Sequence, residues 1–422
     1  MATIITPALS WVRKGRRFVF LALSIFLVAE TARVGLAAFL LRETDVGSME
    51  RSLVLNPKDA ALNFRLARVY HMLMIGDEDK AKASYFNSLY HNPQLASPWL
   101  GLAEMFIEDG DEQRAQAALN RAFDLAPSSI GNVWEGSILA LRLGNTSLAI
   151  RGLRVIAKAD PGRRGRVFDI SWQLIDDPEL ILGEVVTDGI LPSYLGYLIS
   201  KDRLDATFPV WERMKKRGVV SDSAALRYVD FLIRKGRGLE AFSIWREMFR
   251  ERDDDSIVWN GGFENEPLGR GFDWRIGKAE GVGIELDRRE RFHGDRSLRI
   301  TFDGKHNVDF YHLSQVIPIH PRSDYLFTSE IATRGITTRN GISWEVSCYP
   351  KGGMRKSSEP LTGTNEWKTV RLAFHTPSDC NSVVARLRRY RSTRLDKFIS
   401  GTVWVDDVKL FKVETNANAQ SR

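Results

Sequence analysis

The sequence predicts a multidomain α + β protein with an N-terminal transmembrane helix, an α-solenoid of helical hairpins and a C-terminal antiparallel β-sandwich. Three observations lead to this prediction: an apolar run near the N-terminus, prolines at regular intervals through a helical region, and alternating strand patterns after residue 255. A chain of 422 residues is also too long for one ordinary hydrophobic core. We therefore expect four segments: residues 1–45, 46–255, 256–414 and a disordered tail at 415–422.

Composition limits the functional classes. Hydrophobic residues make up 43% of the chain and aromatic residues 10%, which is typical of folded protein rather than disorder. The net charge of +7 is modest for this length, and the basic residues are spread over many segments. The charge therefore does not indicate a nucleic-acid partner.

The first segment carries a candidate membrane anchor. Residues 18–41 form an apolar run of 24 residues, enough to cross a hydrocarbon core of ~30 Å. The basic cluster "WVRKGRR" precedes it, which predicts a cytoplasmic N-terminus, a single pass through a bacterial inner membrane, and the bulk of the chain in the periplasm or outside. Glu30 and Arg33 interrupt the run and can pair on one helix face. A cleaved signal peptide with its apolar region at residues 18–29, or a buried helix, are the alternatives.

The second segment repeats itself. Prolines at positions 57, 93, 127 and 161 are spaced by 36, 34 and 34 residues. In the second unit, small alanines let two antiparallel helices approach, a glycine permits a turn with φ > 0, and a proline ends the second helix. This unit resembles the tetratricopeptide repeat, whose signature positions hold Trp99, Leu102, Ala103, Phe106, Gly110, Ala115, Leu119, Ala122 and Pro127.

These repeats are clearest over residues 57–161 and degenerate over residues 162–255. Ala206 and Ala241 lie 35 residues apart in two further hairpins that resemble the pentatricopeptide repeat, a reader of RNA. The small number of such units and the export signal favour degenerate solenoid units, with no nucleic-acid partner. A solenoid presents a surface to partner proteins, here proteins of the cell envelope. The alternative is a spacer that holds the C-terminal domain off the membrane.

In the third segment, apolar and polar residues alternate with a period of two, as in β-strands. At least seven alternating or β-branched runs, separated by turn residues, predict an antiparallel sandwich. It opens with "NGGFE" and closes with "GTVWVDDVKL", with "RSLRI" and "EWKTVRLAFHTP" between them. The order and spacing resemble the carbohydrate-binding modules of families 4 and 9, within the galactose-binding-like jelly rolls. The resemblance implies a sugar-binding jelly roll, in which Trp274 and Trp367 match positions that usually fill the core.

The resemblance also implies a structural calcium ion beside the first and last strands. Calcium prefers hard carboxylate oxygens, so the candidate ligands are Glu264, Asp406 and Asp407. The alternative is a pair of solvated acids at a strand end. No cofactor is required otherwise.

Strand alternation separates a candidate sugar-binding face from core side chains such as Trp344 and Leu387. Aromatic rings can stack on sugar rings, and polar groups can bond the hydroxyls. The candidates are Tyr311, Gln315, Glu345, Tyr349, Arg386, Arg388 and Tyr390. The alternative is a polar outer face that binds no ligand.

The two cysteines, Cys348 and Cys380, can form a disulfide in an oxidising compartment. Alternatively, Cys348 is a small buried hydrophobic residue.

Catalytic motifs are absent from the sequence: no P-loop, HExxH, GxSxG or GxGxxG pattern occurs. The solenoid and the sandwich also leave no segment to hold an active site. We therefore expect a non-catalytic, membrane-anchored scaffold of the cell envelope, which binds partner proteins and a polysaccharide during exopolysaccharide or surface-glycan assembly or export. The main alternative is a protein–protein adaptor whose jelly roll binds no sugar, and a third is a hydrolase with a cryptic site.

Overall fold

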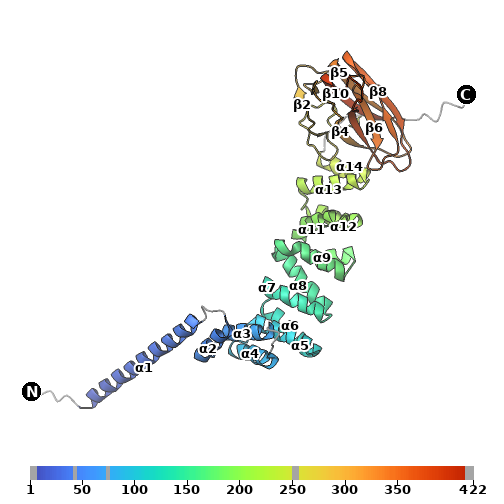
Figure 1. Ribbon diagram of the computed structural model, residues 1–422. Helices are drawn as coiled ribbons and strands as arrows, with labels where there is room; N and C mark the ends of the chain where they lie inside the picture. The colour runs from blue at the N-terminus through green and yellow to red at the C-terminus, as the bar shows by residue number, and fades with distance from the viewer. Residues whose placement is uncertain (1–6, 41–44, 73–76, 250–255, 414–422) are drawn as a thin grey trace, which may run out of the picture. The chain divides into compact units, whose positions relative to one another are not determined.

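The computed structural model describes residues 7–40, 45–72, 77–249 and 256–413 (Figure 1). The predicted tail at 415–422 lies outside the described residues. Contacts divide the chain into two compact units, Met1–Tyr194 and Leu195–Arg422, which we describe separately. Helices followed by two antiparallel sheets confirm the predicted fold class.

The first helix, α1 (Pro7–Leu40), contains residues 18–40 of the predicted apolar run, and position 41 lies outside the described residues. Its segment Phe18–Leu40 is long and apolar enough to cross a membrane. Arg33 Nη2 and Glu30 Oε2 lie 2.6 Å apart, so the two charges that interrupt the run pair at i, i+3. The short helix α2 (Val46–Leu55) packs beside the end of α1, where Ser52 Oγ donates a hydrogen bond of 2.9 Å to the carbonyl oxygen of Ala37.

Three helical hairpins of equal size follow in the first unit. Each has a first helix of 13 residues and a second of 14. They are α3 (Ala60–Met72) with α4 (Glu78–His91), α5 (Ala96–Glu108) with α6 (Glu112–Leu125), and α7 (Ile130–Arg142) with α8 (Thr146–Ala159). This regularity follows the spacing of the prolines, which lie just after α2, α4, α6 and α8.

Small residues set the spacing of these helices. A Cβ on Gly101 of α5 would lie 2.3 Å from the ring of Tyr85 in α4, so only glycine allows this approach. Gly110 adopts φ +75° in the turn between α5 and α6. The side chains of Leu102, Ala103, Phe106, Ala115, Leu119 and Ala122 are buried, whereas Trp99 is half-buried and Pro127 follows α6.

The regular pattern ends after α8. The next elements are shorter and unequal: η1 (Pro161–Arg163), α9 (Arg164–Leu174), α10 (Pro178–Glu184), η2 (Asp188–Ile190) and α11 (Leu191–Ser200). This change agrees with the loss of sequence register after the proline at position 161.

The second unit combines helices with a β-sandwich. Its helices are α12 (Leu204–Arg217), α13 (Asp222–Arg234) and α14 (Gly238–Met248). Sheet A has the order β1-β4-β9-β6-β7 and sheet B the order β2-β3-β10-β5-β8, with every neighbouring pair antiparallel. The strands of sheet A are β1 (Arg275–Ile276), β4 (Phe310–Pro318), β6 (Ser343–Cys348), β7 (Arg355–Ser357) and β9 (Ser382–Arg389). Those of sheet B are β2 (Val282–Asp287), β3 (Ser297–Asp303), β5 (Asp324–Ile336), β8 (Gly363–His375) and β10 (Ser400–Val413).

The core of the sandwich lies between the two sheets. Trp274, Trp344 and Phe327 are fully buried there, with ring centroids 6.0 Å and 5.1 Å from Trp344. Cys348 at the end of β6 forms a disulfide with Cys380, which precedes β9, with Cα atoms 5.7 Å apart. Of the two tryptophans expected in the core, Trp274 is there. Trp367 is not: it is half-buried and contacts Phe292 at 5.8 Å.

The helical hairpin α13–α14 packs directly on the sandwich. The ring of Trp245 in α14 contacts those of Trp259 and Phe272, with centroids 5.5 Å and 6.0 Å away. A Cβ on Gly238 would lie 1.9 Å from Ser382 Oγ, so the start of α14 touches the start of β9. These contacts agree with a second compact unit that contains α13 and α14 together with the sandwich, although helix changes to strand near the boundary predicted at 255/256. Independent folding of residues 256–414 stays a prediction.

Candidate functional site

Sheet A has an outer face opposite the core. Trp344, Leu387 and Leu313 point into the core, so their strand neighbours point outward. The β-register then places five outward residues in one row across the sheet. This row is Arg275, Ser314, Arg386, Glu345 and Ser357, from β1, β4, β9, β6 and β7.

Three of the predicted residues form an exposed stack at one end of this face. The guanidinium carbon of Arg388 lies 3.9 Å from the ring centroid of Tyr390 and 5.5 Å from that of Tyr311. Tyr390 is 47% exposed and Tyr311 is 52% exposed. We call Tyr311, Arg388 and Tyr390 the aromatic stack. It presents two phenol rings to solvent, one from β4 and one from the residue that follows β9.

Carboxylates hold the aromatic stack in place. Arg388 Nη1 donates a hydrogen bond to Asp309 Oδ1, and the Tyr390 hydroxyl donates one of 2.6 Å to Glu345 Oε2. Burial opposes the charge on Arg388, but the hydrogen bonds with Asp309 and Tyr390 raise its pKa overall. Glu345 is only 3% exposed, so it positions Tyr390 from within the face.

Gln315 does not lie on this face. Its side chain is buried on the core side, where Oε1 accepts from the N–H of Trp259 at 3.1 Å and Nε2 donates to the carbonyl oxygen of Trp259 at 2.7 Å. The alternation that grouped Gln315 with Tyr311 fails because the register of β4 shifts between Phe310 and Leu313. Gln315 therefore links β4 to the backbone of Trp259, in the segment that precedes the first strand.

The other end of the outer face is covered. Val316 and Val384 point outward, yet each is only 4% exposed, because α14 packs against this end. Tyr349 is half-buried there, next to Pro350, whose Cδ would lie 3.4 Å from a Cβ on Gly236. The predicted residues thus separate into an open group, with Arg386, Arg388, Tyr311 and Tyr390, and a covered one with Tyr349.

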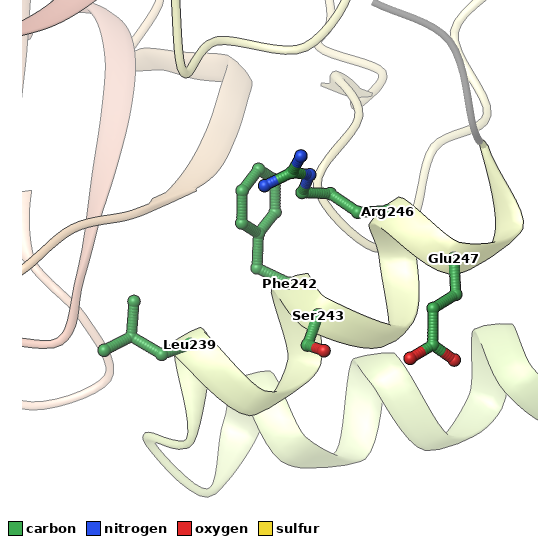
Figure 2. Close-up of a pocket in the computed structure, with 5 residues that line it drawn as sticks. All are labelled: Leu239, Phe242, Ser243, Arg246 and Glu247. Atoms are coloured by element: carbon green, nitrogen blue, oxygen red, sulfur yellow. The ribbon is translucent and has the colours of Figure 1, made fainter.

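A shallow pocket of about 510 Å³ lies on α14 itself. Leu239, Phe242, Ser243, Arg246 and Glu247 line it (Figure 2). Figure 2 shows Phe242 and Arg246 on the same side of the helix, and the Phe242 ring contacts Phe272 edge-on at 5.3 Å. None of the predicted sugar-binding residues lines this pocket.

The predicted calcium ligands lie near one loop. Asp406 is fully buried: its Oδ2 accepts from the N–H groups of Phe292 and His293 at 2.9 and 3.0 Å, and its Oδ1 accepts from that of Asp407 at 2.7 Å. Burial raises the pKa of Asp406 despite these donors. Glu264 Oε1 accepts from the N–H of Asp295 in the same loop at 2.9 Å.

These residues only partly fit a calcium site. A Cβ on Gly262 would lie 3.7 Å from Asp406 Oδ1 and 4.0 Å from Glu264 Oε1, so the two carboxylates approach one glycine. Asp407 instead pairs with Lys409 at 2.8 Å. Within residues 256–413 and the other described ranges, no three His, Cys, Asp or Glu side chains form a metal cluster. Calcium would need backbone carbonyls to complete its shell.

The first unit has a charged surface along the first helices of its hairpins. Arg68 of α3 pairs with Glu135 of α7 at 2.6 Å, and Arg142 of α7 pairs with Glu104 of α5 at 3.0 Å. His71 of α3 contacts Glu108 of α5 at 2.8 Å. These pairs join neighbouring hairpins through partly exposed side chains, so each contributes little to stability.

Comparisons with known proteins give similar solved structures but no family. No protein-family model matches the chain, and no curated protein matches it. Similar solved structures include one described as "CBM4 structure and function", 17% identical with a TM-score of 0.28 over 37% of this chain and 99% of that one. Another is a family 16 carbohydrate-binding module, 15% identical with a TM-score of 0.26 over 37% and 99% of the two chains. The CBM22-1 xylan-binding domain of Paenibacillus barcinonensis Xyn10C is 11% identical with a TM-score of 0.24 over 37% and 93%.

Sequence reasoning missed three residues of this face. Asp309 orients Arg388, and the His312 ring stacks on Tyr311 with centroids 4.4 Å apart. Arg275 was missed because β1 has two residues, too few to show an alternating pattern. Only its basic charge next to Trp274 was visible in the sequence.

Proposed function

We propose that this protein is a non-catalytic, membrane-anchored scaffold that binds a polysaccharide on the outer face of sheet A. Its helical hairpins, which resemble tetratricopeptide repeats, would bind partner proteins of the cell envelope. α1 would anchor it in the inner membrane with the remainder in the periplasm or outside. Such a scaffold fits exopolysaccharide or surface-glycan assembly or export.

The aromatic stack is the observation that carries this proposal. Sugar rings expose C–H groups on their faces, and these pack well on the apolar, electron-rich face of a phenol ring. Tyr311 and Tyr390 are about half exposed, and the partly exposed side chains of Asp309 and Arg388 place an acceptor and donors beside them. The carboxylates and the guanidinium fix the rings before a ligand arrives, which lowers the entropy lost on binding.

The test uses the full-length chain in detergent micelles on a glycan array, followed by titration of the best glycan. Tyr390→Ala should weaken binding at least tenfold, because it removes one stacking surface and the anchor of Arg388. Phe398→Ala removes another exposed ring and serves as the control, with no expected change. Retention by no glycan at all would overturn the proposal.

One observation favours a second function, a protein–protein adaptor. α14 covers one end of the same outer face and leaves a shorter open surface than the sequence predicts. An adaptor of this kind would retain its envelope partners after Tyr390→Ala and would bind no glycan. A hydrolase would release reducing ends from a polysaccharide, whereas neither scaffold nor adaptor would.

A further inference from the structure

The row of outward residues on sheet A contains a guanidinium without a partner. Arg386 lies directly between Ser314 and Glu345 in the β-register. Oppositely charged residues in such cross-strand positions normally pair. Here Glu345 bonds Tyr390 instead, and among the described residues Arg386 forms no hydrogen bond or ion pair through its side chain.

The same row contains a second arginine, Arg275, which pairs with Ser314 rather than with Arg386 and shares its carboxylate partner with another arginine. Arg275 shares the Asp230 carboxylate with Arg270, at 3.6 Å and 3.0 Å respectively. Arg275 Nη1 is buried and has no hydrogen-bond partner in the described part of the chain. Burial lowers the pKa of Arg275, which is consistent with a poorly compensated charge. Because Nη1 is not open to solvent, it cannot contact a ligand directly. The positive charge of Arg275 would instead attract an anion electrostatically.

Across the face, positive charge exceeds negative charge. Five guanidinium groups (Arg270, Arg275, Arg355, Arg386 and Arg388) accompany four carboxylates (Asp230, Asp273, Asp309 and Glu345) on and beside the row. Arg355 is 65% exposed and lies 3.9 Å from Glu345, so its charge is also available to a ligand. A low-dielectric sheet surface strengthens this excess relative to bulk water.

We propose that the polysaccharide bound on this face is acidic, and that Arg386 binds its carboxylate, sulfate or phosphate groups. The planar guanidinium donates two parallel hydrogen bonds to such an oxyanion, and the Ser314 hydroxyl beside it supplies a third donor. The aromatic stack then holds the sugar ring that carries the anion. This inference rests on the proposed glycan binding and names the class of glycan.

The experiment compares matched sugars on the full-length protein. The array carries uronate-containing oligosaccharides, their methyl-esterified forms, sulfated oligosaccharides and the unsulfated parents. We expect retention of acidic members and at least tenfold weaker binding of their neutral counterparts. Comparing affinity for the uronate-containing oligosaccharides with affinity for the sulfated ones shows which oxyanion the site prefers.

Arg386→Gln then tests the residue. We expect affinity for the acidic sugar to fall about tenfold to a hundredfold, the usual cost of losing a charged hydrogen-bond pair. Arg386→Lys should restore part of it. Arg371→Gln, which removes the same charge from the exposed outer face of sheet B, is the matched control and should change affinity less than twofold. Thermal unfolding of Arg386→Gln should match that of the unchanged protein, because Arg386 has no internal partner to lose.

The outcomes separate the two proposals. Equal binding of neutral and acidic sugars that still depends on Tyr390 overturns the acidic class and leaves glycan binding intact. Equal losses from Arg386→Gln and Arg371→Gln also overturn it, because they indicate attraction to the whole basic protein. Retention of no sugar overturns both.

Discussion

The two outer faces of the β-sandwich differ in how far their aromatic side chains are exposed. On sheet B, Trp404 of β10 points outward, yet it is only 6% exposed. The guanidinium of Arg334 lies 5.2 Å over its ring, and its Nε1 donates a hydrogen bond of 3.0 Å to Asp287. On sheet A, the rings of Tyr311 and Tyr390 are about half exposed.

The surrounding charges differ in the same way. Next to Trp404, Arg299 bonds Glu285 and lies 3.6 Å from Asp287, so positive charge on that part of sheet B meets carboxylates. On sheet A, Arg388 pairs with Asp309 and lies beside two rings, but Arg386 has no carboxylate partner in the described residues. On sheet B, the outward Trp404 is buried and stabilises the fold. On sheet A, the rings of Tyr311 and Tyr390 are exposed and the Arg386 side chain is half-buried. We infer that ligand binding belongs to sheet A.

The largest expected effect is on sheet B. Trp404→Ala should lower the free energy of unfolding by about 3 kcal/mol, because it removes a buried indole and leaves Asp287 without its N–H donor. Chemical denaturation measures this change. The matched variant on sheet A, Tyr390→Ala, should cost less than about 1 kcal/mol, since half of its ring is already exposed. Equal losses for both variants would contradict the comparison.

A smaller effect concerns the covered end of sheet A. Asp230 of α13 accepts hydrogen bonds from Arg270 and from the N–H of Gly271 at 2.8 Å, and it lies 3.6 Å from Arg275. Asp230→Ala should destabilise the second unit by about 2 kcal/mol, because two guanidinium groups lose their shared carboxylate. The side chain is 21% exposed, which keeps the cost below that of a fully buried pair.

Glu212→Ala is the control for Asp230→Ala. Glu212 pairs with Lys215 on the surface of α12 and is 67% exposed, so its loss should cost less than about 0.5 kcal/mol. If Asp230→Ala is equally mild, the hairpin α13–α14 is not held to the sandwich by this contact. The contacts of Trp245 with Trp259 and Phe272 would then hold it there.

The sequence predicted the elements better than their contacts. Regular prolines and alternating patterns are local, so the helical hairpins and the strands followed from them. The same alternation placed Glu345, Arg386, Arg388 and Tyr390 on one face. It failed for Gln315, because a β-bulge is a local change of register that composition does not reveal. The cover provided by α14 depends on contacts between residues far apart in sequence, such as Gly238 and Ser382.

The smallest expected effect tests the proposed calcium site on the sheet B side. Asp406 is buried, and burial raises its pKa, so without a cation the folded protein binds this proton more tightly than the unfolded chain does. In chelator, stability should therefore fall as the pH rises from the unfolded-state pKa of about 4 through the higher folded-state pKa. Asp406→Asn should remove this fall, measured by denaturation between pH 4 and 7.

Calcium should reverse the trend, because it binds the ionised carboxylate and restores stability at neutral pH. At ten times its Kd, the ion should add about 1.4 kcal/mol at pH 7 and less at pH 4. Glu264→Ala should lower the melting temperature more in calcium than in chelator, where only the hydrogen bond from the N–H of Asp295 is lost. Equal shifts in both conditions, or no response to calcium in the unchanged protein, would contradict the calcium proposal. The buried Asp406 would then be held by its three N–H donors alone, and sheet B would serve stability without a metal ion.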